Sequence, residues 1–317
     1  MSFKLRLFFA VLVVIGAGVV LVASRALRAP GEQTVVIGGK QFTEQEIIGE
    51  IMAALIESNS DIEVERRLNL GGTMICFNAL KAGDLDLYAE YTGTGLVNIL
   101  KREVIADPEE AYDVVQKDFR EQFDLVWLQP FGFNNTYTLT MRKDHAKKLD
   151  VESISGLADL VRRAEEQDRP ERLRAGFDAE FLTRPDGYLG LKDVYDFQFA
   201  SEPRQMDPGL MYRAVADEAV DVIDGFATDG RIPAYDLYVL EDDKGFFPPY
   251  YAAPLVRAET LELFPELEQI LNSLAGKLTD DVMQQLNYQV DEEGRKAAEV
   301  AREFLVSKGL IPDDSAE

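Results

Sequence analysis

The sequence predicts an α/β fold with two lobes. From residue 34 onward, short apolar runs alternate with segments whose apolar residues recur at helical spacing. Alternating strands and helices are typical of a mostly parallel sheet covered by helices. At 317 residues, the chain also exceeds the usual size of a protein with a single hydrophobic core. We therefore expect two α/β units.

The first group of elements carries clear local signals. Thr43, with Glu46 three residues later, has the pattern of a capping box before an amphipathic helix. Thr73 is expected to cap the next helix, and Gly83 to end it. Strands are expected over 34–38, 62–68, 86–88, 126–128 and 136–142.

A second group of elements follows. Asp107 before a proline predicts the start of a helix that runs towards residue 123, and Thr279 is expected to cap a later helix. Helices are expected over 157–166, 208–216 and 294–308, and strands over 173–177 and 220–226. The charged stretch 165–172 between two of these elements is expected to lie in solvent.

The composition excludes several classes of function. With 57 acidic against 33 basic residues, the net charge of -24 argues against nucleic acid as a partner, because phosphate binding needs a basic surface. The chain has one cysteine, Cys76, and one histidine, His145, which gives little support to zinc binding or Cys-His catalysis. Cys76 is expected to be a small buried apolar residue. No carboxylate pair stands out as an acid and base, so we expect neither catalytic residues nor a cofactor.

The N-terminus has the layout of an export signal. Lys4 and Arg6 precede an apolar run over 7–23, which small residues follow. Residues 1–30 are therefore predicted to be a signal peptide or an N-terminal membrane anchor. In both cases the rest of the protein works outside the cytoplasm.

Two segments of the chain echo each other. Residues 79–95 can be placed over 214–230 without gaps, which aligns Asp86 with Asp221 and Tyr91 with Phe226. Each segment then ends a strand with an aromatic residue and a polar turn. Since α/β sheets bind ligands at the carboxyl ends of their strands, the two turns are expected to face one ligand.

Aromatic residues gather at these strand ends. Tyr91, Tyr137 and Phe226 lie at the ends of predicted strands, and the ring-rich segment 246–251 follows another. Core packing explains any one of them alone. Several ring faces around one cleft would instead suit a quaternary ammonium group, which cation-π attraction holds.

Five motifs carry a resemblance to a known family. They are GKQFTEQ at 39–45, LGGT at 70–73, EYTGTG at 90–95, TDGR at 228–231 and LEDDKGFFPPYYAAPLVR at 240–257. In this order they resemble the substrate-binding proteins of ABC importers for osmoprotectants such as glycine betaine, choline and proline betaine. The resemblance extends from about residue 35 to about residue 310.

The resemblance implies a two-lobed clamshell of the periplasmic-binding-protein type with two crossover strands. The lobe boundaries are expected at 34–132 plus 248–311 for one lobe and 133–247 for the other. A ligand would lie between the lobes, with its trimethylammonium group in an aromatic cage and its carboxylate on basic and hydroxyl groups.

The resemblance also assigns site residues. The cage positions fall on Tyr91, Tyr137, Phe226 and Tyr250, with Tyr251 as the alternative to Tyr250. The carboxylate positions fall on Lys40, Thr94 and Arg184, and Asn135 would line the cage with its backbone carbonyl. Phe226 departs from the family's usual tyrosine and lacks its hydroxyl.

The partners implied are a small quaternary amine and an ABC permease of the inner membrane with its cytoplasmic ATPase. A monomer in the periplasm is expected. Three alternatives stay open at this point: a binding protein for an amino acid or another small zwitterion, a membrane-anchored sensor, and an enzyme such as a transferase on the same scaffold.

Overall fold

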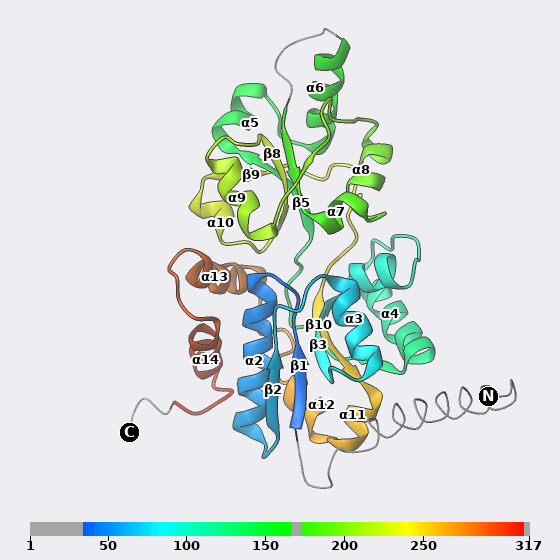
Figure 1. Cartoon of the computed structure of the whole chain (residues 1–317), viewed down its shortest axis with the longest axis vertical. Helices are drawn as coiled ribbons and strands as arrows, with labels where there is room; N and C mark the ends of the chain where they lie inside the picture. Colours follow the sequence, from blue (N-terminus) through cyan, green and yellow to red (C-terminus); the bar gives the residue numbers. More distant parts are fainter. Residues whose placement is uncertain (1–33, 167–172, 314–317) are drawn as a thin grey trace, which may run out of the picture.

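Two five-stranded sheets form the centres of two lobes. The structure is a computed structural model that describes residues 34–166 and 173–313. The first sheet has the order β2 (Glu63–Arg67), β1 (Thr34–Gly38), β3 (Leu87–Tyr91), β10 (Ala252–Arg257) and β4 (Leu125–Trp127). The second has the order β7 (Arg204–Gln205), β6 (Ala175–Phe177), β8 (Val222–Phe226), β5 (Tyr137–Arg142) and β9 (Leu237–Val239). We call the parts around these sheets the first and the second lobe (Figure 1).

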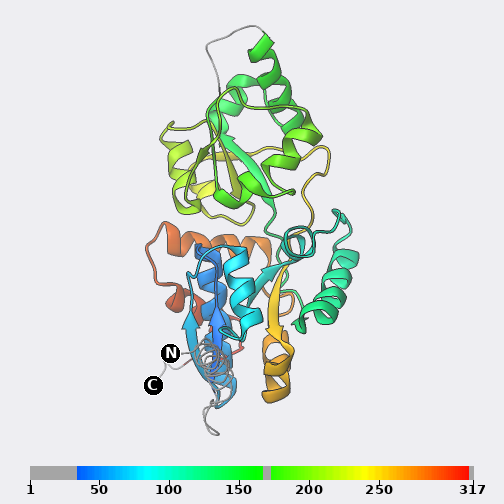
Figure 2. The ribbon, with the colours of Figure 1, turned by 45° about the vertical axis from the view of Figure 1, so that its right-hand side comes forward.

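The chain crosses between the lobes twice. It leaves the first sheet after β4 to enter the second with β5, and it returns after β9 to enter the first with β10. Both entering strands run antiparallel to both of their neighbours, which are β8 and β9 for β5, and β3 and β4 for β10. The lobes therefore lie one above the other, joined by two extended segments (Figure 2).

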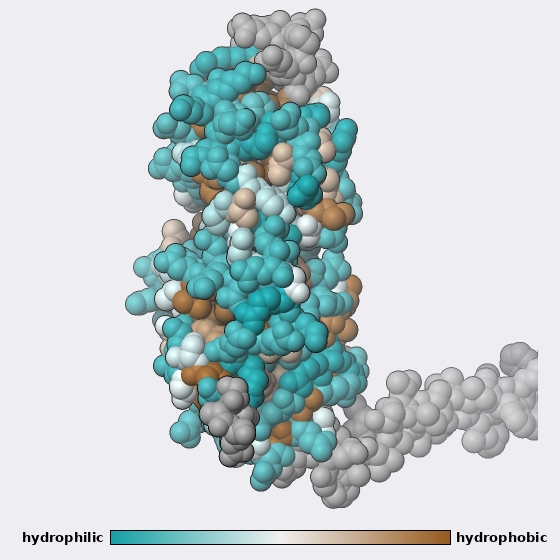
Figure 3. Space-filling model, turned by 90° about the vertical axis from the view of Figure 1, so that its left-hand side faces the viewer, coloured by the Kyte–Doolittle hydropathy of each residue, from teal (hydrophilic) through white to brown (hydrophobic). Residues whose placement is uncertain are grey.

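Helices cover both sheets. Around the first sheet lie α2 (Thr43–Asn59), α3 (Thr73–Ala82), the π-helix η1 (Thr94–Ile99), α4 (Pro108–Phe123), α11 (Ala258–Leu263), α12 (Glu266–Asn272), α13 (Asp280–Asp291) and α14 (Ala297–Ser307). Around the second lie α5 (Lys143–Leu149), α6 (Ile154–Glu166), α7 (Ala179–Thr183), α8 (Tyr188–Tyr195), α9 (Pro208–Ala216) and α10 (Arg231–Ala234). The surface in Figure 3 is mostly hydrophilic with scattered hydrophobic patches, as the acidic composition requires.

Helix α2 anchors the core of the first lobe. Ile47, Ile51 and Leu55 recur on one face and are almost fully buried. Full burial of such a side chain stabilises the fold by about 1.5 to 3 kcal/mol. This packing holds α2 against the sheet, and Gln45 in its first turn donates to the Ala89 carbonyl of β3 at 3.1 Å.

The sequence echo has a physical basis in the sheets. Asp86, just before β3, accepts a 2.8 Å hydrogen bond from the backbone N–H of Val36. Asp221, just before β8, accepts one of the same length from the backbone N–H of Arg174. In both lobes a carboxylate thus ties the start of one parallel strand to the strand beside it.

Two predicted N-terminal caps are wrong and two are confirmed, and Gly83 ends α3 in the left-handed conformation as predicted. Thr43 is the first residue of α2 and donates its hydroxyl to Asp291 Oδ1 at 2.5 Å, so a distant acceptor takes the place of the expected capping box. Gly72 precedes α3, and both donors of Thr73 bind the other lobe. Asp107 and Thr279 accept from backbone N–H groups as predicted.

Two predictions lie outside the described residues. They are the signal or anchor at 1–30 and most of the charged stretch at 165–172. Within 34–166 and 173–313, every helix is too short or too polar to span a membrane. The strand expected over 86–88 extends to Tyr91, and the helix expected from residue 294 begins at Ala297.

Candidate functional site

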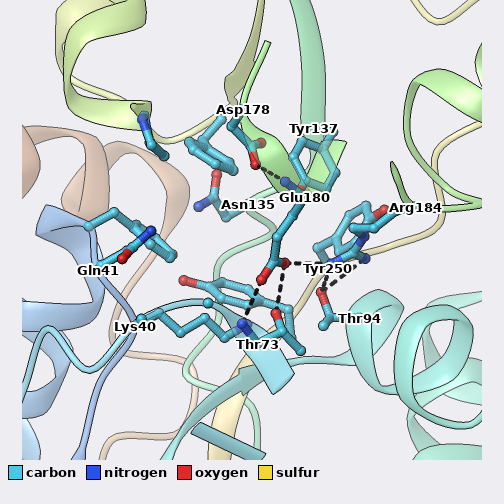
Figure 4. Close-up of a pocket in the computed structure, with 16 residues that line it drawn as sticks. Lys40, Gln41, Thr73, Thr94, Asn135, Tyr137, Asp178, Glu180, Arg184 and Tyr250 are labelled. Atoms are coloured by element: carbon cyan, nitrogen blue, oxygen red, sulfur yellow. Dashed lines mark hydrogen bonds and ion pairs between the residues drawn. The ribbon is translucent and has the colours of Figure 1, made fainter. Parts of the chain in front are cut away.

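A cavity lies between the lobes, where the carboxyl ends of β1, β3, β6 and β8 meet. It contains about 570 Å³ of space, part of it open to solvent. All eight residues named from the sequence line it: Lys40, Tyr91, Thr94, Asn135, Tyr137, Arg184, Phe226 and Tyr250. Eight further residues complete the wall: Gln41, Phe42, Gly71, Gly72, Thr73, Asp178, Glu180 and Pro208. Figure 4 shows how the labelled side chains converge.

Aromatic rings form one wall of the cavity. The Tyr137 ring centroid lies 5.4 Å from that of Phe226 and 5.6 Å from that of Tyr250, whose ring is perpendicular to it. Phe42 stacks on Phe226 at 5.4 Å and lies 6.4 Å from Tyr91. Tyr251 does not line this cavity but a second cleft, which Asn134 and Pro249 also line. Phe42 is a fifth ring that the sequence reasoning missed, although it lies inside the first motif.

A buried acid fixes the position of Tyr91. The Tyr91 hydroxyl donates a 2.7 Å hydrogen bond to Glu44 Oε1 and accepts one of 3.0 Å from Gln45 Nε2. Burial raises the pKa of Tyr91 well above 10, so the phenol is protonated. Lys40 Nζ lies 5.0 Å from the centre of the ring.

Glu44 is the centre of a hydrogen-bond network that the sequence reasoning missed. Its Oε1 also accepts from Asn135 Nδ2 at 2.8 Å, and its Oε2 accepts from the Thr228 hydroxyl at 2.5 Å and from Asn287 Nδ2 at 3.2 Å. Burial raises the pKa of Glu44 above its usual 4.5, despite these hydrogen bonds. In the sequence, the position of Glu44 in the first turn of a helix gave no sign of these distant partners. Its partners come from both lobes and from a crossing segment.

The side chain of Asn135 joins this network. Its Nδ2 donates to Glu44, and its Oδ1 accepts from the backbone N–H of Thr228 at 3.3 Å. Its own N–H donates to the backbone carbonyl of Tyr250 at 3.1 Å. Asn135 thus links the crossing segment to both lobes, and the role expected for its backbone carbonyl remains a prediction.

The two cations of the cavity have acidic partners within the protein. Lys40 Nζ lies 2.5 Å from Glu90 Oε1, and Tyr88 donates to the other oxygen of Glu90 at 2.9 Å. Glu90, which had no assigned role from the sequence, holds the lysine. Arg184 forms a two-pronged ion pair with Asp186 through Nε and Nη2.

Arg184 reaches across the cavity from the second lobe. Its Nη1 and Nη2 each lie 3.3 Å from the Thr94 hydroxyl oxygen in the first lobe. Its guanidinium carbon lies 5.4 Å from the centre of the Tyr137 ring. Only 4% of its surface is exposed. Arg184 therefore connects the aromatic wall with the polar end of the cavity.

Two acids of the second lobe were also missed. Asp178 caps α7 by accepting from the backbone N–H groups of Glu180 and Phe181. Burial and the nearby Asp178 raise the pKa of Asp224 well above its usual 3.8. Glu180 reaches the first lobe, where its carboxylate accepts from the N–H and hydroxyl of Thr73. Asp178 and Glu180 did not stand out in the sequence, because each resembles an ordinary residue at a helix start.

The site contains little that would support metal chemistry. Within residues 34–166 and 173–313, no three His, Cys, Asp or Glu side chains are arranged to hold a metal ion. Cys76 is buried, as predicted, and burial raises the pKa of its thiol to about 11. The donors and rings of the cavity suit a small organic ligand held between two lobes.

The fold and the cavity define a two-lobed solute-binding protein. Residues 33–307 match the family OpuAC, described as the substrate-binding domain of the ABC-type glycine betaine transport system. The chain belongs to this family, and the resemblance expected from the five motifs is confirmed.

Individual relatives agree with this assignment. The chain is 40% identical over 281 residues to a carnitine transport binding protein of Listeria monocytogenes, with 88% of each chain covered. It is 38% identical over 280 residues to an ergothioneine transport permease and binding protein of Helicobacter pylori, which covers 88% of this chain and 48% of that longer protein.

A solved structure shows the same fold. The crystal structure of a glycine betaine/carnitine/choline ABC transporter component is 39% identical and superposes with a TM-score of 0.70. The match covers 87% of this chain and 99% of that chain. The predicted fold class, an α/β clamshell of the periplasmic-binding-protein type, is therefore confirmed.

Proposed function

We propose that this protein binds a quaternary ammonium osmoprotectant, such as glycine betaine, in the cavity between its lobes and delivers it to a membrane permease. The observation that carries the proposal is the ring cluster of Tyr137, Phe226 and Tyr250. A trimethylammonium group cannot donate a hydrogen bond, so aromatic faces are its natural partners. Tyr91 and Phe42 extend the cluster towards the first lobe.

The polar end of the cavity suits the other half of a betaine. Lys40, Thr94 and Arg184 lie beside the rings, and the planar fork of an arginine can hold a carboxylate with two hydrogen bonds. Asn135 belongs to the same wall. A ligand with a cation at one end and a carboxylate at the other matches this order of groups.

We infer that the ligand favours the closed arrangement of the lobes. Lys40, Tyr91 and Thr94 come from the first lobe, whereas Tyr137, Arg184 and Phe226 come from the second, so a ligand that touches both sets stabilises their approach. We place the lobe boundaries at 34–132 plus 248–311 and at 133–247. The closed form is the state that a permease would recognise.

The family supplies the partners. Substrate-binding proteins of ABC importers work with a permease and an ATPase, and we propose that this chain serves an inner-membrane permease as a monomer. We further propose that residues 1–30 direct the chain to the periplasm. Mass spectrometry of the protein from the cell envelope distinguishes a cleaved signal from a retained anchor.

Isothermal titration calorimetry tests the ligand class. The panel contains glycine betaine, choline, proline betaine, carnitine and ergothioneine, with glycine and proline as amino acids that lack the trimethylammonium group. Binding of at least one quaternary amine, with little heat from the two amino acids, supports the proposal. Binding of the amino acids alone would favour the alternative of a general zwitterion receptor.

We also propose that the protein performs no covalent chemistry on its ligand. The acids in and around the cavity have structural roles: they pair with Lys40, Arg184 or Thr73, or belong to the network around Glu44, and Asp178 caps α7. Proton NMR of a bound ligand after long incubation is expected to show the starting compound. A converted product would instead favour an enzyme.

A further inference from the structure

The carboxylate of Glu180 lies at the polar end of the cavity. Glu180 belongs to α7 of the second lobe, yet its Oε1 accepts a 2.6 Å hydrogen bond from the backbone N–H of Thr73, at the start of α3 in the first lobe. Its Oε2 accepts a 2.9 Å hydrogen bond from the Thr73 hydroxyl. A carboxylate is thus already bound between the lobes, and it belongs to the protein (Figure 4).

The surroundings of this carboxylate are those that an anionic ligand would need. Arg184 Nη1 lies 3.5 Å from Glu180 Oε2. Although burial opposes ionisation, Lys40, Arg184 and the Thr73 donors hold the pKa of Glu180 below 4.5. The N-terminus of the ten-residue helix α3 adds a favourable partial charge. Gly72 makes the approach possible, because a Cβ at this position would collide with the Glu180 carboxylate.

The charge balance leaves little room for a second carboxylate. Lys40 is paired with Glu90, and Arg184 is paired with Asp186. With Glu180 added, these two cations face three carboxylates, and Asp178 of the cavity wall is a further acid. The carboxylate of a betaine would raise this number further in a partly buried site, where like charges repel strongly.

Glu180 is less enclosed than its ionised neighbours. Its side chain is 32% exposed, in contrast to the side chains of Arg184 at 4% and Asp186 at 0%. If Glu180 turned outward, a ligand carboxylate would restore the same charge balance and take over the same donors. A ligand without a carboxylate would require no such exchange.

We propose that Glu180 occupies the carboxylate position of the cavity and thereby sets ligand specificity, disfavouring zwitterionic betaines relative to quaternary ammonium cations that lack a carboxylate. The proposal rests on the proposed function, because it concerns the choice among quaternary amines. Glu180 would thus select ligands by the group at their polar end, as the aromatic rings select them by the ammonium group.

Calorimetry on the full-length protein tests this with two probes. Glycine betaine carries the carboxylate, and choline carries a neutral hydroxyl in its place. The variants are Glu180→Gln, which removes the charge at similar size, and Glu180→Ala, which removes the side chain. Glu202→Gln is the control, because Glu202 is an exposed acid of the same lobe.

The expected result is a change in the ratio of affinities. In both Glu180 variants, glycine betaine should gain about tenfold relative to choline, and Glu202→Gln should keep the wild-type ratio. A general loss of closure would weaken both ligands alike and leave the ratio unchanged, which would overturn the proposal, as would a fall in the ratio. If the wild-type protein binds no quaternary amine, the proposed function fails and this inference fails with it.

Discussion

The Tyr91 hydroxyl donates a 2.7 Å hydrogen bond to Glu44, an acid that also binds the Thr228 hydroxyl of the opposite lobe. Tyr91 ends β3, and Glu44 lies in the first turn of α2. One carboxyl group therefore fixes a ring of the cavity wall and at the same time joins the two lobes. The orientation of that ring depends on lobe closure as well as on local packing.

Replacing Tyr91 tests its role in the cavity wall. Tyr91→Ala should weaken binding of a quaternary amine by about 1 to 2 kcal/mol or more, because one cation-binding face is lost. Tyr91→Phe keeps the ring and should retain most of the affinity. Tyr251→Ala serves as the control, since Tyr251 lines the second cleft. Unchanged affinity in Tyr91→Ala would mean that this ring only packs.

Replacing Phe226 by tyrosine tests the effect of the missing hydroxyl on ligand binding. Phe226→Tyr should tighten binding of a quaternary amine, since a phenol ring presents a more negative face than a phenyl ring; we expect a gain of about 0.5 to 1 kcal/mol. The ring of Phe226 stacks on Phe42 and packs beside Tyr137, so the added hydroxyl changes the polarity of this wall. Calorimetry measures the gain. Weaker binding would show that the wall has no space for the extra oxygen.

Gly230 tests lobe closure. It precedes α10 of the second lobe, and a Cβ placed on it would lie 2.6 Å from backbone and side-chain atoms of Tyr288 in α13 of the first lobe. Its φ of -66° suits alanine, so Gly230→Ala should leave the fold intact while it obstructs the closed form.

We expect about tenfold weaker ligand binding in Gly230→Ala, which corresponds to about 1.4 kcal/mol, with little change in melting temperature. Small-angle X-ray scattering should show a larger radius of gyration at saturating ligand than for the wild type. Gly245→Ala is not a suitable control because its φ is 62°. Gly156→Ala is suitable, because the nearest atom would lie 3.6 Å away. A radius of gyration of ligand-saturated Gly230→Ala equal to that of the wild type would contradict the prediction.

Glu44 predicts a pH dependence of stability. Burial raises the pKa of Glu44 in the folded protein above 4.5. Its contribution to the free energy of unfolding is therefore fully present below pH 4.5 and is lost as the pH rises through the folded pKa. Glu44→Gln has no such proton to lose. The melting temperature of Glu44→Gln, relative to the wild type, should therefore rise between pH 4.5 and pH 8. A constant difference over this range would show that Glu44 is ionised in the folded protein at its ordinary pKa.

The residues that the sequence revealed share one property: their motifs are local. Seven of the eight predicted residues lie at or near strand ends, whereas Arg184 follows α7, and all eight line one cavity. Helix α4 likewise begins where Asp107 and its following proline predict. Local chemistry predicted the helix starts and strand ends, whereas the roles of the site residues were assigned through the resemblance of these motifs to a known family. Their roles toward a ligand remain predictions.

The residues that were missed depend on distant partners. Glu44 lies 91 residues from Asn135, 184 from Thr228 and 243 from Asn287, and all three bind its carboxyl group. Glu180 lies 107 residues from Thr73. At the start of a helix, a glutamate has a sufficient local explanation in the helix dipole. Only the arrangement of the lobes shows that these acids serve another purpose.

The two crossing segments also restrict how the molecule can move. The two segments are hydrogen-bonded to each other. Asn134 forms a β-bridge with Tyr251. The N–H of Asn135 donates to the Tyr250 carbonyl, and the Tyr250 N–H donates to Asn134 Oδ1 at 2.7 Å. Two crossing segments that are hydrogen-bonded to each other resist twisting and sliding of the lobes but still allow a hinge motion. Each closure of the lobes then brings the same residues together, so a bound ligand contacts both halves of the cavity wall in one fixed arrangement.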